Sequence, residues 1–574
     1  MNKKFYLGID AGGTHTDAAL LRGGGGATTL LASAKVETRH NDLTASVREA
    51  LADLARALGA GGAGIFKEIG SVTLGATLAV NALVQGKADA VGLALSAGLG
   101  LNPLRFAIGE HVCVVPGGLD HRGLEIRPLE TRELDSAAIG WKRQGLPACA
   151  CAGKFSPRNP AHERAMARTA AGHGFSVTQG HRLSGSLNFP RRIATAYYNA
   201  AVERLHLAFL DAVEKALAGA GIRAPAFLLK ADGGATPLSL SRRCPVQSIL
   251  SGPAASVMGI LALCPSVVRG CSLLLDMGGT TTDIALVVDG SPVIDRDGML
   301  LNDRRTLVRS LAAVSVGVGG DSLLTTDAAG VHAGPLREGP AMAFGGGRPT
   351  LLDALNALNA PAGGPAAGDT AASQRGIAAL AASRPDFAGR AADLAEAAVE
   401  DGLKCVRQAA EALVARVNAR PVYTLAALRA VYRAAPERIV LVGGPAACVR
   451  GRLENSFHLP VESPAHADVA NAVGAALTLP TASLEIYADT GQGILRAPAL
   501  DLEERIGRSF TLEAARLRCG ELLAAHLAEE GVSDTPIEVV EADLFATLSD
   551  SGYGARDIRV ACQVVPGLAG RLRP

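Results

Sequence analysis

Two stretches of the chain share one pattern of apolar and polar positions. Residues 5–21 are FYLGIDAGGTHTDAALL, and residues 272–288 are SLLLDMGGTTTDIALVV. In each stretch a short apolar run ends at an aspartate, a Gly-Gly-Thr segment follows, and a Thr-Asp pair leads into a second apolar run. Short apolar runs joined by glycines are typical of buried strands connected by a turn. The pattern therefore predicts two β-hairpins of the same construction.

The two hairpins correspond position by position. Asp10 aligns with Asp276 and Asp17 aligns with Asp283, with the same spacing of seven between the two aspartates in each copy. The distance between the copies is far longer than the period of a solenoid repeat. The repeat therefore predicts two similar domains and not an array of small units.

The residue types of the hairpins suit phosphate binding. Glycines lack a Cβ atom, so backbone N–H groups can approach phosphate oxygens closely, and threonines add hydroxyl donors. The candidate ligand-binding residues are Gly12, Gly13, Thr14, Thr16, Gly278, Gly279, Thr280 and Thr281. One such turn is common in ordinary hairpins, but two copies with matched spacing indicate a triphosphate held between them.

Asp10 and Asp276 stand at the strand ends beside these turns. Mg²⁺ prefers a few carboxylates together with phosphates and water, so both are candidate metal ligands and candidate catalytic residues. The alternative is that each aspartate only caps its turn. Asp17 and Asp283 either accept hydrogen bonds from hairpin N–H groups or face the metal, and Asp283 is counted among the candidate metal ligands. The hairpins thus predict a site for a triphosphate and Mg²⁺.

Three further segments extend the pattern. SGPAASVMGI (251–260) and ADVANAVGAAL (467–477) predict helices whose small residues allow close packing. RIVLVGGPAACVRGRL (438–453) predicts a buried strand, a Gly-Gly turn and the start of a helix. Gly443 and Gly444 are candidates for a flat backbone surface under an adenine ring. The alternatives are a plain helix pair and a common strand-to-helix turn.

Charge and composition limit the classes of binding partner that we expect. The chain of 574 residues carries 56 Lys and Arg against 55 Asp and Glu, and only 4% of its residues are aromatic. Nucleic-acid binding usually needs a basic excess and stacking aromatics, so neither nucleic acid nor an acidic membrane surface is expected as a partner. Association with further copies of the chain is left open.

The cysteines and the N-terminal segment indicate the cellular compartment in which we expect the protein. The ten cysteines are scattered through apolar runs without a CxxC pair, which indicates buried, reduced thiols. Cys149 and Cys151 are predicted on one face of a strand, and a zinc or redox role for them is the less favoured alternative. The N-terminal apolar run meets Asp10 at once, unlike a signal peptide, and no apolar stretch suits a membrane span. We therefore expect a cytoplasmic protein.

Taken in order, these motifs resemble the actin/heat-shock-chaperone/sugar-kinase ATPase superfamily. The superfamily pattern is a phosphate hairpin, a connecting helix, a second phosphate hairpin, an adenosine strand-turn and a second connecting helix. Here these fall at 10–17, 251–260, 276–283, 442–445 and 467–477. The resemblance implies an α/β fold with two RNase H-like, actin-type halves around a nucleotide cleft, carrying inserted subdomains and a C-terminal α/β extension.

Several shorter sequence segments resemble those of the A-type subunit of the hydantoinase/oxoprolinase family. LGATLAVNALVQGKA (74–88) matches through Gly75, Thr77, Asn81 and Ala82, and FSPRNPAHERAM (155–166), SVGVGGDSLL (315–324) and FGGGRPTLLDAL (344–355) match further family stretches. The resemblance implies an ATP-dependent hydrolase component acting on a cyclic amide, such as a hydantoin or a 5-oxoproline-like lactam. It also implies phosphorylation of the amide oxygen and a possible separate B-type subunit.

Some segments differ from the family's sequence pattern, and others allow two interpretations. Lys230-Ala-Asp-Gly-Gly stands where the family has Ser-Asp-Gly-Gly, and Asp321 replaces a glycine. The loop with Gly317, Gly319 and Gly320 is a third candidate cofactor-binding element, its alternative being a flexible turn.

Another ambiguous stretch is Asn-Pro-Ala-His-Glu at 159–163, which is either a structural signature or a substrate contact. Its sequence predicts a helix that begins at Pro160 with Asn159 as the N-cap.

The domain organisation follows from these positions. We predict a first ATPase half at 1–270 with an inserted substrate-side subdomain at about 85–190, and a second half at 271–480 with a helical insertion at about 355–435. Residues 481–574 form a C-terminal extension that the ATPase core does not explain. Two other hypotheses for function are a small-molecule kinase of the same fold and a chaperone-like or reactivase-like ATPase.

Overall fold

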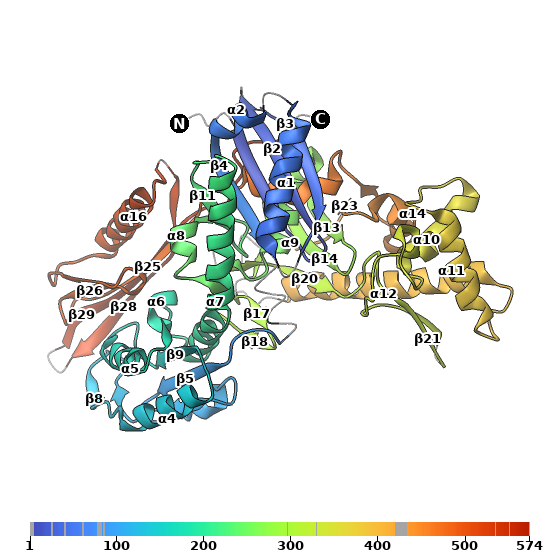
Figure 1. Cartoon of the computed structure of the whole chain (residues 1–574). Coiled ribbons are helices and arrows are strands. Elements are labelled where there is room, and N and C mark those ends of the chain that lie inside the picture. Colours follow the sequence, from blue (N-terminus) through green and yellow to red (C-terminus); the bar gives the residue numbers. More distant parts are fainter. Residues whose placement is uncertain are drawn as a thin grey trace.

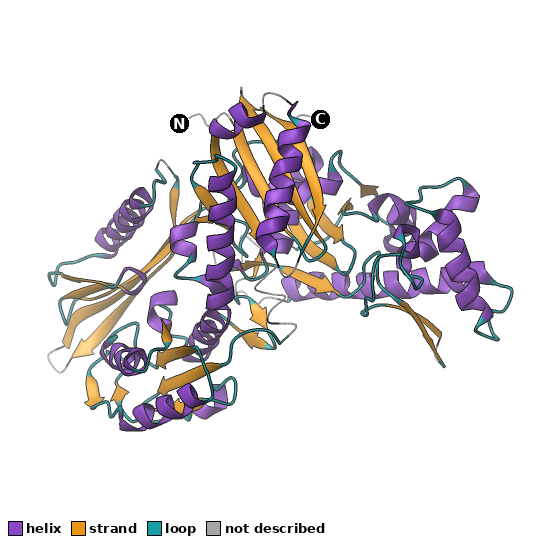
Figure 2. Ribbon diagram, viewed as in Figure 1, coloured by secondary structure: helices purple, strands orange, loops and turns teal. Residues whose placement is uncertain are grey.

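The computed structural model describes residues 5–24, 27–39, 42–59, 62–76, 83, 86–295, 297–328, 330–419, 433–533, 535–549 and 552–572. These residues form a mixed α/β fold in which helices cover several separate sheets (Figures 1 and 2). Among them, no helix combines the length and apolar character that a membrane crossing requires. Most of the 74–88 family stretch, including Thr77, Asn81 and Ala82, lies outside the described residues.

The first large sheet carries the first hairpin. Its strand order is β12-β11-β4-β1-β2-β3. The strands are β1 (Phe5–Ala11), β2 (His15–Gly24), β3 (Ala27–Glu37), β4 (Ile69–Ala76), β11 (Ala226–Leu229) and β12 (Ala235–Pro237). Strand β1 is antiparallel to β2 and parallel to β4, so the carboxyl ends of β1, β4 and β11 meet at one edge.

The second large sheet repeats this pairing. Its order is β15-β14-β13-β23-β24, with β20 joined to β14. The strands are β13 (Cys271–Met277), β14 (Thr282–Val288), β15 (Ser291–Pro292), β20 (Ala313–Val316), β23 (Arg438–Val442) and β24 (Val461–Glu462). Strand β13 is antiparallel to β14 and parallel to β23, as β1 is to β2 and β4. The predicted fold of two similar halves is thereby confirmed.

Two helices rich in small residues cross between the sheets. Helix α9 (Ser251–Leu263) packs on β13, β14 and β23, and helix α15 (Ala470–Leu477) packs on β1, β2 and β4. A Cβ atom on Gly259 would stand 2.2 Å from the carbonyl oxygen of Ala470, and one on Gly474 would stand 2.2 Å from the amide nitrogen of Gly259. The predicted close packing is confirmed, and each helix joins its own half to the other.

Longer helices cover the outer faces of the two sheets (Figure 1). On the first sheet, α1 (Leu43–Ala57) and α7 (Phe189–Gly219) contribute to a core with β1, β2 and β4. On the second, α10 (Leu351–Asn359), α12 (Ala391–Asn418) and α14 (Ala446–Phe457) pack on β13, β14 and β23, with α11 (Thr370–Ala382) beside α10 and α12. Alanine-rich sequence at helical spacing explains this segment, because small side chains let these helices pack closely.

A third sheet lies below the first half in Figure 1. Its order is β10-β9-β5-β6, and all neighbours are parallel. The elements are β5 (Val91–Ser96), β6 (Val112–Val114), β9 (Ala148–Gly153), β10 (Ser176–Gln179), α4 (Arg132–Arg143), α5 (Ala161–Gly172) and α6 (Gly180–Leu183). Cys149 and Cys151 on β9 are fully buried, unpaired by disulfide and part of one apolar cluster, as expected for inert thiols.

The C-terminal part forms an antiparallel sheet with one covering helix. Its order is β27-β26-β25-β29-β28. The elements are β25 (Ser483–Asp489), β26 (Ile494–Ala497), β27 (Leu502–Arg505), β28 (Ile537–Ser549), β29 (Gly552–Val564) and α16 (Leu512–Glu529). The core between sheet and helix includes Phe227 and Ala235 of the first half. The terminal strand predicted at 558–568 is present, although it begins earlier and ends at Val564.

Shorter elements connect these layers. They are α2 (Gly62–Lys67), β7 (Gly118–Leu119), β8 (Glu125–Arg127), α8 (Leu238–Ser241), β16 (Ile294–Asp295), β17 (Leu300–Leu301), β18 (Arg304–Arg305), β19 (Ser310–Leu311), β21 (Leu324–Asp327) and β22 (Gly330–Ala333), together with short 3-10 turns.

Candidate active site

The two hairpins have the same backbone geometry. Asp10 lies opposite Asp17 in one ladder, and Asp276 lies opposite Asp283 in the other. Each turn is closed by one hydrogen bond: the Gly12 amide donates to the His15 carbonyl at 3.0 Å, and the Gly278 amide donates to the Thr281 carbonyl at 2.9 Å. The repeat seen in the sequence is therefore a repeat of structure.

The tips of the two turns face one another. A Cβ atom on Gly279 would lie 3.8 Å from the hydroxyl oxygen of Thr14. Beyond the closing bonds, the amides of Gly13, Thr14, Gly279 and Thr280 donate to no residue in the described part of the chain. Free N–H groups on two opposed turns can donate to one anion placed between them.

The carboxylates of Asp10 and Asp276 meet beneath these turns. The side-chain amide of Asn471 on α15 lies 3.3 Å from Oδ2 of each carboxylate. The Ser256 hydroxyl on α9 donates to the same oxygen of Asp276 at 2.5 Å. The crossing helices thus supply the neutral donors that hold two like charges together.

Asp10 is the more confined of the two carboxylates. Its Oδ1 has no hydrogen-bond partner among the described residues, and a Cβ atom on Gly75 would stand 2.3 Å from it. Burial, reinforced by the neighbouring charge of Asp17, raises the pKa of Asp10 to about 7. A buried, unpartnered carboxylate oxygen beside a second carboxylate fits a bound cation, which would favour the charged form.

This donor set fits Mg²⁺. Within the described residues, no group of three or more His, Cys, Asp or Glu side chains is arranged to hold a metal on its own. Mg²⁺ usually takes one or two carboxylates and completes its shell with phosphate oxygens and water. Asp10 and Asp276 beside free turn amides provide that combination.

Asp17 and Asp283 take different roles from one another. Asp17 forms an ion pair with Lys35 at 2.8 Å, and burial raises its pKa. Burial and the charge of Asp276 raise the pKa of Asp283 to about 7, while a hydrogen bond with Ser315 opposes the shift. Asp17 therefore anchors β3 to the hairpin, whereas Asp283 adds negative charge next to Asp276.

The third glycine loop supports the second hairpin. The amides of Gly320 and Asp321 donate to the carbonyls of Gly278 and Gly279 at 2.9 and 2.6 Å. A Cβ atom on Gly319 would stand 2.7 Å from the Gly278 carbonyl oxygen, so glycine is required there. The loop therefore holds the turn of the second hairpin in place, and its role in cofactor binding stays a prediction.

Asp321 and Gly317 complete that loop. Asp321 pairs with Arg337 at 3.2 Å and accepts a hydrogen bond from the Ala341 amide at 3.1 Å. A Cβ atom on Gly317 would stand 2.8 Å from Pro335. The loop is therefore held in place by the Asp321–Arg337 ion pair and by the close packing of Gly317 against Pro335.

The strand-turn after β23 approaches Asp276. Gly443 has a φ of 103°, and a Cβ atom there would stand 2.1 Å from the Met277 carbonyl oxygen and 2.9 Å from Asp276 Oδ1. Gly444 faces open space, with no atom within 4 Å of a built Cβ position. Gly443 thus permits the close approach, and Gly444 leaves a bare backbone surface.

Three contributors were missed in the sequence: Ser256, Asn471 and Lys35. Ser256 and Asn471 are polar residues within helices made otherwise of small and apolar residues, and that contrast was the available signal. Lys35 gave no signal, because an exposed-looking lysine on a strand is unremarkable until the strand pairs with Asp17.

The Asn-Pro-Ala-His-Glu segment lies away from the hairpins, in the third sheet's layer. His162 contacts Glu125 at 2.7 Å, and the fully buried Glu163 accepts hydrogen bonds from the amides of Gly153 and His181 at 3.2 and 2.9 Å. Helix α5 begins at Ala161 and not at Pro160, which is the N-cap residue itself. The predicted helix is present and begins one residue later than Pro160, and the Asn159 side chain accepts a hydrogen bond from the Ala161 amide at 3.0 Å.

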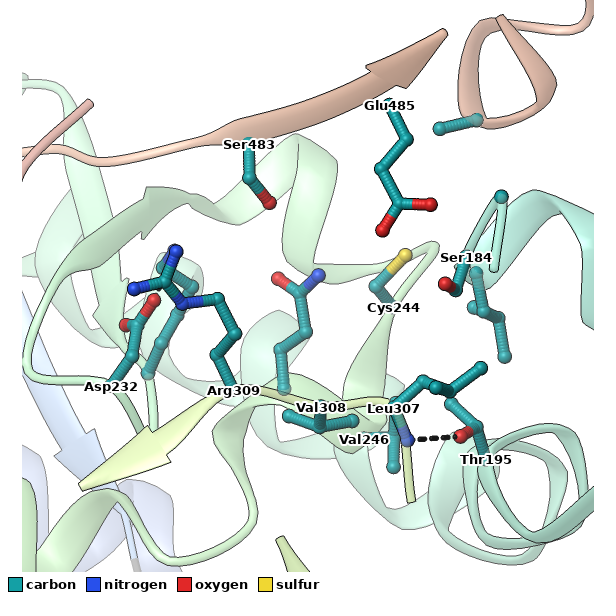
Figure 3. A pocket seen from close by; sticks show the side chains of 15 residues that line it. Ser184, Thr195, Asp232, Cys244, Val246, Leu307, Val308, Arg309, Ser483 and Glu485 are labelled. Atoms are coloured by element: carbon teal, nitrogen blue, oxygen red, sulfur yellow. Dashed lines mark hydrogen bonds and ion pairs between the residues drawn. The ribbon is translucent and has the colours of Figure 1, made fainter. Parts of the chain in front are cut away.

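A separate pocket opens beside the same edge of the first sheet (Figure 3). Its volume is about 110 Å³. Lys230 and Asp232 follow β11, Arg309 comes from the segment before β19, and Glu485 comes from β25. The Leu307 amide donates to the Thr195 hydroxyl at 2.8 Å and ties this segment to α7. Several separate parts of the chain therefore meet at one polar cavity.

The matched halves, crossing helices and opposed phosphate-type turns define an α/β fold of the actin-type ATPase class. The chain belongs to the hydantoinase/oxoprolinase family. The hydantoinase/oxoprolinase family model matches residues 192–483, and the model of the family's N-terminal region matches residues 6–174. Together the two matches include both hairpins and the adenosine-type strand-turn.

Known relatives extend this finding. Over 392 residues the chain is 29% identical to the caprolactamase subunit alpha of Pseudomonas jessenii, covering 62% of this chain and 55% of that protein. Over 398 residues it is 24% identical to the acetophenone carboxylase gamma subunit of Aromatoleum aromaticum (strain DSM 19018 / LMG 30748 / EbN1), covering 61% and 52%. The chain thus spans about half the length of these relatives.

A solved structure shares the fold across nearly the whole chain. A nucleotide-free acetone carboxylase structure superposes with a TM-score of 0.71 and 16% identity, covering 97% of this chain and 87% of that one. At that identity the likeness concerns the fold.

Proposed function

We propose that this chain is the ATP-using component of an enzyme that opens a cyclic amide, such as a hydantoin or a lactam. The observation that carries the proposal is the pair Asp10 and Asp276, held by one amide beneath two opposed turns. Family membership and the similarity to a caprolactamase subunit support the choice of substrate class.

The residues of the two hairpins would bind the nucleotide. The free amides of Gly13, Thr14, Gly279 and Thr280 would donate to phosphate oxygens, and Gly443 and Gly444 would lie against the adenine ring. Thr280 and Thr281 would add hydroxyl donors. Bound Mg²⁺ would neutralise phosphate charge during transfer, with Asp10 and Asp276 on its side of the site. Asp283, which lies opposite Asp276 in the hairpin, would be on the side of the site where the metal binds.

The chemistry depends on activating an unreactive bond. The γ-phosphoryl group would pass to the amide oxygen, releasing ADP, while the ring N–H proton leaves to a base. The product would be an imidate phosphate, whose carbon is a far better electrophile than that of a resonance-stabilised amide. Water would add to this carbon, and the ring C–N bond would break as the nitrogen takes a proton back from the base. The acyl phosphate left behind would be hydrolysed by a second water to a carboxylate and phosphate. Asp10 or Asp276, the two carboxylates beside the phosphates, would position the attacking group or accept its proton.

The experiment is a lactam-dependent ATP hydrolysis assay. Purified chain with Mg²⁺ would be given 5-oxoproline, hydantoin, 2-pyrrolidinone and caprolactam, and ADP release would be followed. We expect at least one cyclic amide to raise the rate over the basal rate, and the matched open-chain amino acid to leave it unchanged. No stimulation by any cyclic amide would count against the proposal. A stable phosphorylated product would favour a kinase instead.

We also propose that a second subunit takes part, because the relatives are named as subunits of larger enzymes. Co-purification with the product of a neighbouring gene tests this point.

A carboxylase is the second candidate, favoured by the acetone carboxylase fold and the acetophenone carboxylase relative. It predicts ATP hydrolysis stimulated by a ketone together with bicarbonate, and not by lactams.

A further inference from the structure

The pocket in Figure 3 lies beside the sheet edge at which the first hairpin turns, because Lys230 and Asp232 directly follow β11. Strands β1, β4 and β11 are adjacent and parallel, with Asp10 paired to Gly75 and Leu228 paired to Leu74. Lys230, just after β11, therefore stands two strands from the end of β1, a separation of roughly 10 Å. A small molecule in the pocket and a phosphate held at the hairpins would therefore lie along the same sheet edge.

One wall of the pocket carries a cation without a partner. Lys230 pairs with Asp232 at 3.3 Å, and both side chains are largely buried. Arg309, by contrast, forms no ion pair or hydrogen bond through its guanidinium with any described residue. Its backbone is nevertheless fixed, since the Leu311 amide two residues on donates to the Ala231 carbonyl at 2.8 Å. Arg309 therefore presents a half-buried charge at a defined place.

The opposite wall carries an unsatisfied carboxylate. Glu485 points into the pocket from β25 (Figure 3), and its Oε2 has no hydrogen-bond partner among the described residues. That oxygen forms an ion pair with Arg559, whose guanidinium nitrogen is 3.8 Å away. A Cβ atom on Gly185 would stand 2.9 Å from that oxygen, so glycine leaves the space the carboxylate occupies. A buried acceptor of this kind is stabilised when a ligand donates an N–H group.

Building on the proposed function, we propose that the pocket selects a cyclic amide that bears its own carboxylate, with the carboxylate bound to Arg309 and the ring N–H donating to Glu485. The guanidinium fork matches a carboxylate in a bidentate manner. The cavity of about 110 Å³ suits a small ring and excludes bulky substituents. A 5-oxoproline-like ligand has both groups, whereas an unsubstituted lactam leaves Arg309 unpaired.

The charges of the pocket argue against a phosphate ligand. Asp232 and Glu485 line the same cavity as Arg309, and of the charged side chains that line it Arg309 alone forms no ion pair with a described residue. A doubly charged anion would lie near both carboxylates, whereas a single carboxylate matches the one free cation.

The test measures binding with a matched ligand pair. Wild type would be titrated with 5-oxoproline and with 2-pyrrolidinone, the same ring without the carboxylate, in the presence of Mg²⁺ and a non-hydrolysable ATP analogue. Arg309→Gln should weaken 5-oxoproline binding by about tenfold to a hundredfold and leave 2-pyrrolidinone binding nearly unchanged. Glu485→Leu should weaken both ligands. Arg309→Lys should recover part of the loss.

Arg304→Gln is the control, because Arg304 is exposed on β18 outside the pocket. Thermal unfolding of each variant separates lost binding from lost folding. Equal affinity of wild type for the two ligands, or an Arg309→Gln variant that binds 5-oxoproline as wild type does, would overturn the inference. If a larger, uncharged lactam alone binds and stimulates ATP hydrolysis, the inference fails and the proposed function stands. If no cyclic amide binds or stimulates, both fail.

Discussion

Asp10 and Asp276 come from different halves of the chain and share one hydrogen-bond donor, the Asn471 amide, at 3.3 Å from each. Two carboxylates held this close repel one another unless a donor or a cation intervenes. Because the strands carrying them belong to separate sheets, their separation reports how the two halves sit together. The site is therefore also a joint between the halves.

Removing the shared donor tests that joint. Asn471→Ala should destabilise the protein by about 2 kcal/mol, the usual scale for hydrogen bonds to charged groups, and added Mg²⁺ should recover part of the loss. Thermal unfolding with and without Mg²⁺ measures both effects. Asn455→Ala is the control, because Asn455 is exposed on α14. An Asn471→Ala variant with the melting temperature of wild type would contradict the role given to this amide.

Alanine substitutions at two glycines should change stability in opposite directions, because one glycine lies in the helix crossing and the other lies on an open helix surface. Gly259→Ala places a methyl group 2.2 Å from the Ala470 carbonyl oxygen and should cost about 1–3 kcal/mol or more by forcing α9 and α15 apart. Gly140→Ala on α4 meets no atom within 4 Å and should stabilise the protein by about 0.5–1 kcal/mol. Unfolding temperatures of the two variants check this. Equal shifts in both would show that the crossing is not tightly packed.

Lowering the pH should destabilise the fold through a buried histidine that lies outside the hairpins. Burial lowers the pKa of His206 from 6.5 to about 4, and its Nε2 lies 2.9 Å from the Ser241 hydroxyl. The unfolded chain therefore binds more protons between these pKa values, so stability is complete above pH 6.5 and falls as the pH drops toward 4. The loss at pH 5 should be about 2 kcal/mol.

His206→Gln should remove that part of the pH dependence. Melting temperatures at pH 7.5 and pH 5 provide the comparison, with His121→Gln as the control because His121 is exposed. If wild type and His206→Gln lose the same stability between these pH values, His206 is not the group responsible.

The elements that the sequence predicted well are those with a local pattern. The hairpins at Asp10 and Asp276 were predicted because Gly-Gly turns and apolar runs are determined by neighbouring residues. The packing of α9 on α15 followed from their small residues. That Asn471 faces both aspartates could not be predicted, because its direction depends on the crossing at Gly259 and Gly474, a contact between residues more than 200 positions apart.

Features assembled from distant segments were also missed. The pocket with Arg309 and Glu485 draws on several separate parts of the chain, and only the segment that begins at Lys230 corresponds to a family motif. The C-terminal sheet was recognised only through its last strand, since β26 and β27 have just four residues each. The domain boundaries and the catalytic roles of Asp10 and Asp276 stay predictions.

The most direct test of the account is Mg²⁺-dependent ATP binding, measured by titration calorimetry on wild type, Asp10→Asn, Asp276→Asn and the control Asp289→Asn, which alters an exposed residue at the far end of the second hairpin. The account predicts one ATP per wild-type chain, a loss of affinity of about tenfold or more in Asp10→Asn and Asp276→Asn, and wild-type binding in Asp289→Asn. Wild type that binds no ATP, or variants of Asp10 and Asp276 that bind Mg²⁺ and ATP as wild type does, would contradict it.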